Sequence, residues 1–91
     1  MAYELELPAR VKAERWKVKI RDHERVEPPH VTVLHKIRAW RFGLRDRMFL
    51  DREPPPGDVP EEIIDHINER IADLVAAWDE MYPENPVESD R

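Results

Sequence analysis

The sequence predicts an α+β fold, with a three- to four-stranded antiparallel sheet and one long C-terminal amphipathic helix packed on one face. Apolar residues recur at every second position in three separate runs between residues 15 and 44, which is typical of strands. They recur with the 3.6-residue period of a helix between residues 63 and 81. A Pro-rich spacer separates the two patterns, so that the strands come first and the helix last. This order indicates an α+β architecture in which the helix covers one face of the sheet.

Residues 1–14 begin with alternating apolar and polar residues, and this pattern stops at Pro8. The alternation fits a short strand, and an unsupported arm fits equally well because chain termini are often loosely held. The chain beyond them is expected to form a single α+β domain over residues 15–82. Residues 83–91 carry no apolar pattern, and we expect them to be a disordered tail.

Three strands are predicted in the domain. The first covers residues 15–21, where apolar and cationic residues alternate, the second covers residues 30–34, and the third covers residues 37–44. His35-Lys36 leaves room for a two-residue hairpin, although neither residue favours the positive φ of the usual hairpin turns. Residues 48–50 are a candidate for a short fourth strand at the edge of the sheet.

The helix has the strongest pattern in the chain. Its apolar residues lie at spacings of one, three and four and therefore form one stripe that can face the sheet: Ile63, Ile64, Ile67, Ile71, Leu74, Val75, Trp78 and Met81. Asp58 and Glu61 form a capping-box-like pair at its start, and Pro83 ends it. The predicted helix has about five to six turns.

At 91 residues the chain is long enough for one domain with a modest core. It contains no Cys, which excludes disulfides, a thiolate nucleophile and Cys-ligated zinc. It has no apolar run long enough to span a membrane and no hydrophobic signal region after Met1. We therefore expect a cytoplasmic protein that needs no cofactor and does not bind membranes.

Charge is sorted along the chain. Residues 10–52 hold 13 of the 15 Lys and Arg residues against 6 acidic residues, a net charge of +7, whereas residues 53–91 have a net charge of −10. We expect the positive charge on the sheet face that the helix leaves uncovered, and the negative charge on the outer side of the helix and in the tails. A surface divided in this way attracts oppositely charged partners.

The candidate binding residues are the cations that this uncovered face is expected to carry, namely Lys17, Lys19, Arg21 and Arg41. Residues two apart on a strand share a face, so these side chains are expected to form one cationic surface. Such a surface suits the phosphates of RNA, an acidic protein partner, or a second copy of the chain in a homodimer. No aromatic residue is expected there to stack RNA bases, because Trp16, Trp40 and Phe42 point to the core.

His30 is the candidate catalytic residue. It lies on the same strand face as these cations, where a neutral imidazole can act as a general base. The alternative is a structural role, in which the imidazole hydrogen-bonds the backbone after two prolines. His30-Val31-Thr32 also has the His-x-Thr form of two-histidine phosphoesterases, but that chemistry requires two such motifs and the chain has one.

A metal site is not expected. The nearest approach to one is a set of residues whose spacings match no zinc pattern: Asp22, His23, Glu27, His30 and His35. His66 falls on the acidic, solvent side of the predicted helix, where we expect it to be inert.

Residues 27–33 (Glu-Pro-Pro-His-Val-Thr-Val) resemble the motif of a family of small bacterial domains of unknown function. That family has a Pro-Pro-His-Val-His-Val run at the start of a strand, then a strand with Trp or Phe, and a long C-terminal helix with a Trp near its end. The matching residues are Pro28, Pro29, His30, Val31, Trp40, Phe42 and Trp78. The resemblance implies an α+β fold and a gene often found in toxin–antitoxin-like neighbourhoods, but no catalytic residues. Thr32 replaces the second His of the motif, so no role for paired imidazoles is implied.

Two functions follow from these observations. The favoured one is a non-enzymatic interaction module, a candidate half of a toxin–antitoxin-like pair. The alternative is a metal-independent ribonuclease-type toxin that uses His30 and the cationic sheet face. The sequence leaves open whether the protein is an enzyme.

Overall fold

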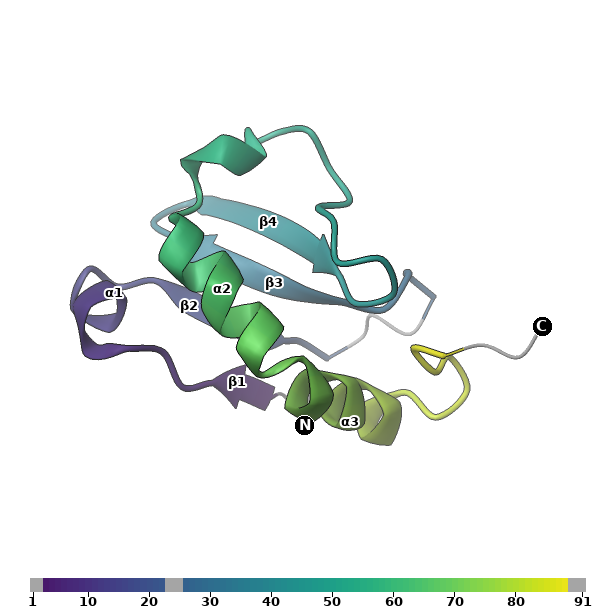
Figure 1. Ribbon diagram of the computed structural model, residues 1–91. Coiled ribbons are helices and arrows are strands. Elements are labelled where there is room, and N and C mark those ends of the chain that lie inside the picture. Colours follow the sequence, from purple (N-terminus) through teal and green to yellow (C-terminus); the bar gives the residue numbers. More distant parts are fainter. Residues whose placement is uncertain (1–2, 23–25, 89–91) are drawn as a thin grey trace.

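The computed structural model describes residues 3–22 and 26–88. Four strands form one antiparallel sheet in which each strand pairs with the next along the chain: β1 Tyr3–Leu5, β2 Lys17–Ile20, β3 His30–His35 and β4 Arg38–Gly43. A short helix, α1 Ala9–Ala13, connects β1 to β2. Two further helices, α2 Glu61–Glu69 and α3 Ile71–Met81, lie on one face of the sheet (Figure 1). The α+β class that the sequence predicts is confirmed.

The register of the sheet sets which side chains face the helices. One row across the three longer strands is apolar and buried: Val18, Val33 and Trp40. The adjacent row, one residue along each strand, consists of Lys19, Thr32 and Arg41. Because side chains alternate along a strand, this second row points to the opposite face. The period-two pattern of the sequence thus produces one apolar face under the helices and one polar face away from them.

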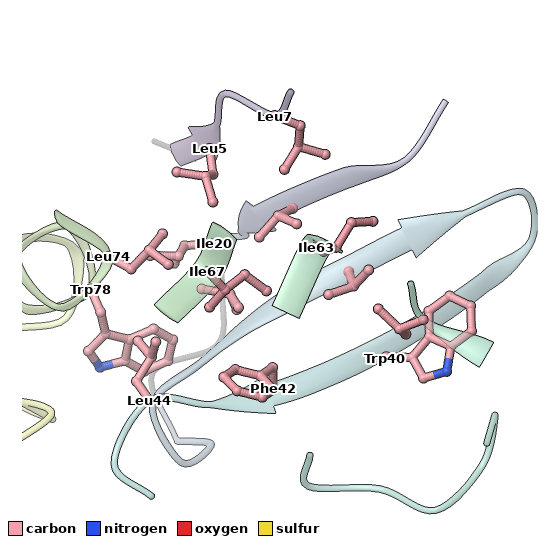
Figure 2. Close-up of a cluster of buried hydrophobic side chains, with 14 of the residues drawn as sticks. Leu5, Leu7, Ile20, Trp40, Phe42, Leu44, Ile63, Ile67, Leu74 and Trp78 are labelled. Carbon is pink, nitrogen blue, oxygen red and sulfur yellow. The ribbon is translucent and has the colours of Figure 1, made fainter. Parts of the chain in front are cut away.

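The core lies between the sheet and the helices (Figure 2). Ile63 and Ile67 of α2 and Leu74 and Trp78 of α3 are buried there. Other positions of the predicted stripe, such as Ile71, pack partly buried at its margin. Burying each of these large apolar side chains stabilises the fold by about 2 kcal/mol, which holds both helices on this face.

The C-terminal helix is divided in two, whereas the sequence pattern predicts one continuous helix. Helical geometry is interrupted at Arg70, which has a φ of −107° and a ψ of 20°. The Arg70 N–H lies 3.1 Å from the carbonyl oxygens of both His66 and Ile67, so the last turn of α2 tightens before α3 begins. Neither Gly nor Pro is present at this position, and the apolar pattern continues through it. The sequence therefore gives no sign of the break. The break turns α3 away from the direction of α2 (Figure 1).

The start of α2 lacks the capping box that the sequence pattern predicts at Asp58. Residues Pro56–Asp58 form a separate 3-10 helix, and α2 has no side-chain cap. Asp58 instead forms an ion pair with Arg38 of β4. The Pro-rich spacer also packs on β4, since Trp40 Nε1 donates a hydrogen bond to the Pro55 carbonyl oxygen at 3.0 Å.

The hairpin between β3 and β4 has its loop one residue later than predicted. His35 pairs with Arg38, and the two loop residues are Lys36 and Ile37. Lys36 has a φ of 57°, in the left-handed region that the usual hairpin turns require. The two-residue hairpin thus forms with Lys36 in a left-handed conformation that Lys does not favour.

Residues 48–50 lie along the outer edge of β4, where the sequence offers a candidate fourth strand. They form one antiparallel bridge, Phe42 with Phe49. Gly43 N donates to Met48 O at 2.8 Å. Gly43 allows this close approach, because a Cβ at that position would lie 3.1 Å from the same Met48 oxygen.

The N-terminal segment forms a strand and a short helix. β1 pairs with β2, with Glu4 opposite Lys19. Leu5, Leu7 and Val11 are buried in the core and anchor the segment, so of the two alternatives the strand is the one observed. Its first two residues lie outside the described part of the chain.

Residues 84–88 pack back on the fold, in contrast to the disordered tail that the sequence predicts for residues 83–91. Val87 is buried, and its N–H lies 2.9 Å from the Asp79 carboxylate. Arg45 Nε donates to the Val87 carbonyl oxygen at 2.8 Å. One apolar residue and isolated hydrogen bonds produce no periodic pattern, which is why the sequence does not reveal this packing. Residues 89–91 lie outside the described part of the chain.

Candidate functional site

The sheet face that α2 and α3 leave uncovered is the candidate functional site (Figure 1). We call it the open face and define it by the strand residues that alternate away from the helices: Glu4, Lys17, Lys19, Thr32, Leu34, Ala39 and Arg41. Lys17 and Ala39 are exposed on it, while Thr32 is buried between its longer neighbours. The open face is the part of the sheet that a partner can reach.

Two lysines supply the free charge of the open face. Lys17 is exposed and Lys19 is half-buried, and among the described residues neither has an ion-pair partner. They are two residues apart on β2, so their side chains leave the sheet on the same side, about 6.7 Å apart. Leu34 and Ala39 lie in the same row as Lys17 and add a partly exposed apolar strip. Lysines beside an apolar strip form a surface suited to an acidic, amphipathic segment.

Arg41 also lies on the open face, but its charge is paired. Its guanidinium donates two hydrogen bonds to Asp51, from Nε to Oδ2 at 2.8 Å and from Nη2 to Oδ1 at 2.7 Å. A third bond joins Nη1 to Glu27 Oε1 at 3.2 Å. The bonds to Asp51 raise the pKa of Arg41, and Arg41 holds the pKa of the Asp51 carboxyl below its ordinary value. Arg41 therefore ties two loops to the sheet and contributes little free charge.

His30 is the first residue of β3, two residues before Thr32 of the open face, and it is closed off from solvent. Its side chain is 0 % exposed. Nδ1 lies 2.8 Å from the Pro28 carbonyl oxygen, and Nε2 lies 3.7 Å from Glu27 Oε1. The centres of the His30 and Trp78 rings are 5.6 Å apart. These contacts join the start of β3 to the preceding loop and to α3, which favours the structural role. The catalytic assignment of His30 stays a prediction.

The open face holds three of the four predicted binding residues: Lys17, Lys19 and Arg41. Arg21 follows the last residue of β2 at the margin, where its carbonyl oxygen accepts a hydrogen bond from the Tyr82 hydroxyl. The sequence does not indicate that Asp51 and Glu27 pair with Arg41. Both belong to irregular segments, in which no periodic signal places a side chain.

Two other arginines near the strand ends make contacts that stabilise the fold. Arg38 pairs with Asp58, and its guanidinium carbon lies 5.0 Å from the centre of the Trp40 ring. Arg45 holds the C-terminal segment through the Pro86 carbonyl oxygen at 2.8 Å. The +7 of residues 10–52 therefore overstates the charge that the sheet region offers to a partner.

Within the described residues, no group of three or more His, Asp or Glu side chains could hold a metal ion. His23, which belongs to the set considered in the sequence, lies outside those residues. His66 is not on the solvent side of α2, where the sequence pattern places it. Its side chain is 17 % exposed, and Nε2 lies 2.8 Å from the Glu6 carbonyl oxygen, which links α2 to the segment after β1.

None of the helices in the described segments is both long enough and apolar enough to cross a membrane. Comparison of the chain with family models, with curated proteins and with solved structures finds no match in any of the three.

Proposed function

We propose that this protein is a non-enzymatic interaction module that binds an acidic protein segment on its open face. The observation that carries the proposal is the pair Lys17 and Lys19, two cations on one strand that have no ion-pair partner among the described residues. The partly exposed Leu34 and Ala39 lie beside them. A segment with acidic and apolar side chains can pair its carboxylates with the lysines while it covers the apolar strip.

The surroundings of His30 support a non-enzymatic module over the ribonuclease alternative. A general base must come within hydrogen-bond distance of the proton that it removes. The His30 ring is instead enclosed, with Nδ1 at the Pro28 carbonyl oxygen and Trp78 against its ring. A substrate would have to displace part of the fold to reach it.

The charges around the open face favour an acidic protein over RNA as the partner. Glu4 lies opposite Lys19, Glu27 and Asp51 pair with Arg41 at the β4 side of the open face, and the whole chain carries a net charge of −5. A long phosphate backbone meets repulsion from these carboxylates, whereas a short acidic segment can place its carboxylates at the lysines alone.

The resemblance of residues 27–33 to the toxin–antitoxin-associated family adds a narrower version of the proposal. In this version the acidic segment belongs to the other half of a toxin–antitoxin-like pair. Its support is the Pro-Pro-His-Val run at residues 28–31 together with the layout of strands and C-terminal helices.

Binding of a fluorescent poly-glutamate peptide to the purified protein tests the proposal. Wild type is expected to bind, and binding is expected to weaken with added salt because exposed charges are screened. Lys17→Glu/Lys19→Glu is expected to weaken binding roughly tenfold or more, since like charges then face each other.

The matched control is Lys12→Glu/Arg52→Glu. It changes the net charge by the same amount at two exposed positions outside the strands, and it is expected to bind nearly as wild type. Equal loss in both variants would contradict the proposal, because net charge rather than the open face would then govern binding. Single-stranded RNA that binds more tightly than poly-glutamate through the same lysines would favour the RNA alternative.

A further inference from the structure

The outer side of α2 carries three exposed carboxylates at successive i, i+4 positions. We call this set the acidic stripe: Glu61, Asp65 and Glu69. Among the described residues, Glu61 and Asp65 have no ion-pair partner, and Glu69 approaches His66 Nδ1 at 3.8 Å. The stripe lines a surface hollow of about 520 Å³ beside the start of α1. Arg10 and Glu62 form an ion pair in the same hollow, and the three carboxylates of the stripe leave this surface negatively charged.

The acidic stripe and the open face cannot neutralise each other within one molecule. Ile63 and Ile67 of α2 face the sheet and are buried, so the exposed stripe is directed away from the sheet. The open face lies on the other side of the same sheet (Figure 1). The protein thus presents a cationic and an anionic surface in opposite directions.

The spacing of the charges on the two surfaces is similar. Lys17 and Lys19, two residues apart on an extended strand, are separated by about 6.7 Å. Glu61 and Asp65, four residues apart on a helix, are separated by about 6 Å along the axis. Two lysines of a strand can therefore face two carboxylates of the helix, with both ion pairs formed at once.

We infer that the acidic partner of the open face is a second copy of this protein, which places the acidic stripe of its α2 over Lys17 and Lys19. This inference rests on the proposed function, because it names the partner of the same face. α2 of one copy then lies on the sheet of the next through its charged side, whereas within each copy it packs on the sheet through Ile63 and Ile67. The contact is head-to-tail, so each end copy keeps one free surface and the assembly grows with concentration.

Self-association and the binding of another acidic chain exclude each other, because both occupy Lys17 and Lys19. A foreign acidic segment bound to the open face therefore separates the copies. Partner binding and assembly are coupled by this competition, with no change in the fold of either copy.

Sedimentation velocity over a concentration series at low salt tests the inference. Wild type is expected to exceed the 10.9 kDa of a single copy as the concentration rises. Lys17→Glu/Lys19→Glu and Glu61→Lys/Asp65→Lys each place like charges across the contact, and each is expected to weaken association roughly tenfold or more. The variant that combines all four substitutions restores opposite charges and is expected to restore association. Lys12→Glu/Arg52→Glu, the same control as above, is expected to associate as wild type does.

Wild type that stays at 10.9 kDa at every concentration, while its open face binds poly-glutamate, overturns this inference and leaves the proposed function intact. Association that persists in both reversed variants also overturns it, because the contact then lies elsewhere. Failure of the wild type to bind poly-glutamate would instead contradict the proposed function itself. Far-UV circular dichroism of each variant separates a lost contact from a lost fold.

Discussion

At the scale of the residue, the burial of His30 favours a structural role over a catalytic one. The ring has no contact with solvent, Nδ1 lies at the Pro28 carbonyl oxygen, and Trp78 packs beside it. An imidazole held in this way fixes the start of β3 against α3. A reaction at this position would require the surrounding contacts to open.

His30→Ala is expected to lower the free energy of unfolding by about 2–3 kcal/mol, because it leaves a cavity and removes a hydrogen bond. Urea denaturation measures the change. Arg52→Ala, at an exposed position, is expected to stay within about 0.5 kcal/mol of wild type. Cleavage of RNA by wild type that disappears in a still-folded His30→Ala variant would contradict the structural role and assign a catalytic one.

The free energy of unfolding depends on pH through Asp51, which pairs with Arg41. Its pKa is lowered chiefly by the hydrogen bonds from Arg41, so its stabilising effect is present above the pKa of the unfolded chain, about 3.9. That effect is lost as the pH falls through the lower pKa of the folded state. Asp51→Asn is expected to destabilise the protein by about 1 kcal/mol at pH 7, since the pair is partly exposed. Urea denaturation from pH 7 downward is expected to show this difference shrinking below about pH 4, and a difference independent of pH would contradict the assignment.

At the scale of the element, the outer edge of β4 depends on a glycine. A Cβ on Gly43 would lie 3.1 Å from the Met48 carbonyl oxygen and 3.2 Å from a Leu50 methyl carbon, so residues 48–50 would have to move. Gly57 is the opposite case, because nothing lies within 4 Å of a Cβ built there.

Gly43→Ala is therefore expected to destabilise the protein by about 1–2 kcal/mol through overpacking. Gly57→Ala is expected to be neutral or to stabilise by up to about 1 kcal/mol, because it reduces the entropy of the unfolded chain. Thermal denaturation of the two variants compares them directly. Equal melting temperatures would show that residues 48–50 do not hold their place against β4.

The segment after Pro83 is an element without regular structure. A chain ended at Pro83 loses the buried Val87 and the hydrogen bonds that Arg45 donates to the carbonyl oxygens of Pro86 and Val87. We expect a loss of about 2–3 kcal/mol in the free energy of unfolding. A chain ended at Glu88 retains these contacts and is expected to be more stable than the chain ended at Pro83 by this amount. Equal stability of the two truncated chains would contradict the packing of Val87.

At the scale of the whole molecule, the periodic patterns of the sequence were sufficient for the fold class and the apolar faces. Val18, Val33 and Trp40 lie together because a period of two repeats in each strand. The break at Arg70 was not predictable in this way, since tertiary packing redirects the chain where no Gly or Pro marks it.

The candidate site was predictable only in part, for a related reason. Lys17 and Lys19 share a face through strand geometry, which the sequence shows directly. The pairing of Arg41 with Asp51 and Glu27 depends on where two irregular loops return to the sheet. The sorted charge of the chain thus predicts a two-faced molecule, while the structure reduces the free charge of the sheet face chiefly to two lysines.

We propose the open face as the surface on which this protein binds its partner. Amide chemical shifts recorded while a poly-glutamate peptide is added to the ¹⁵N-labelled protein locate the binding surface residue by residue. The shifts are expected to concentrate on β2, β3 and β4 around Lys17, Lys19 and Ala39, and to disappear in Lys17→Glu/Lys19→Glu. Shifts that concentrate on α2 and α3, or that persist in this variant, would contradict it.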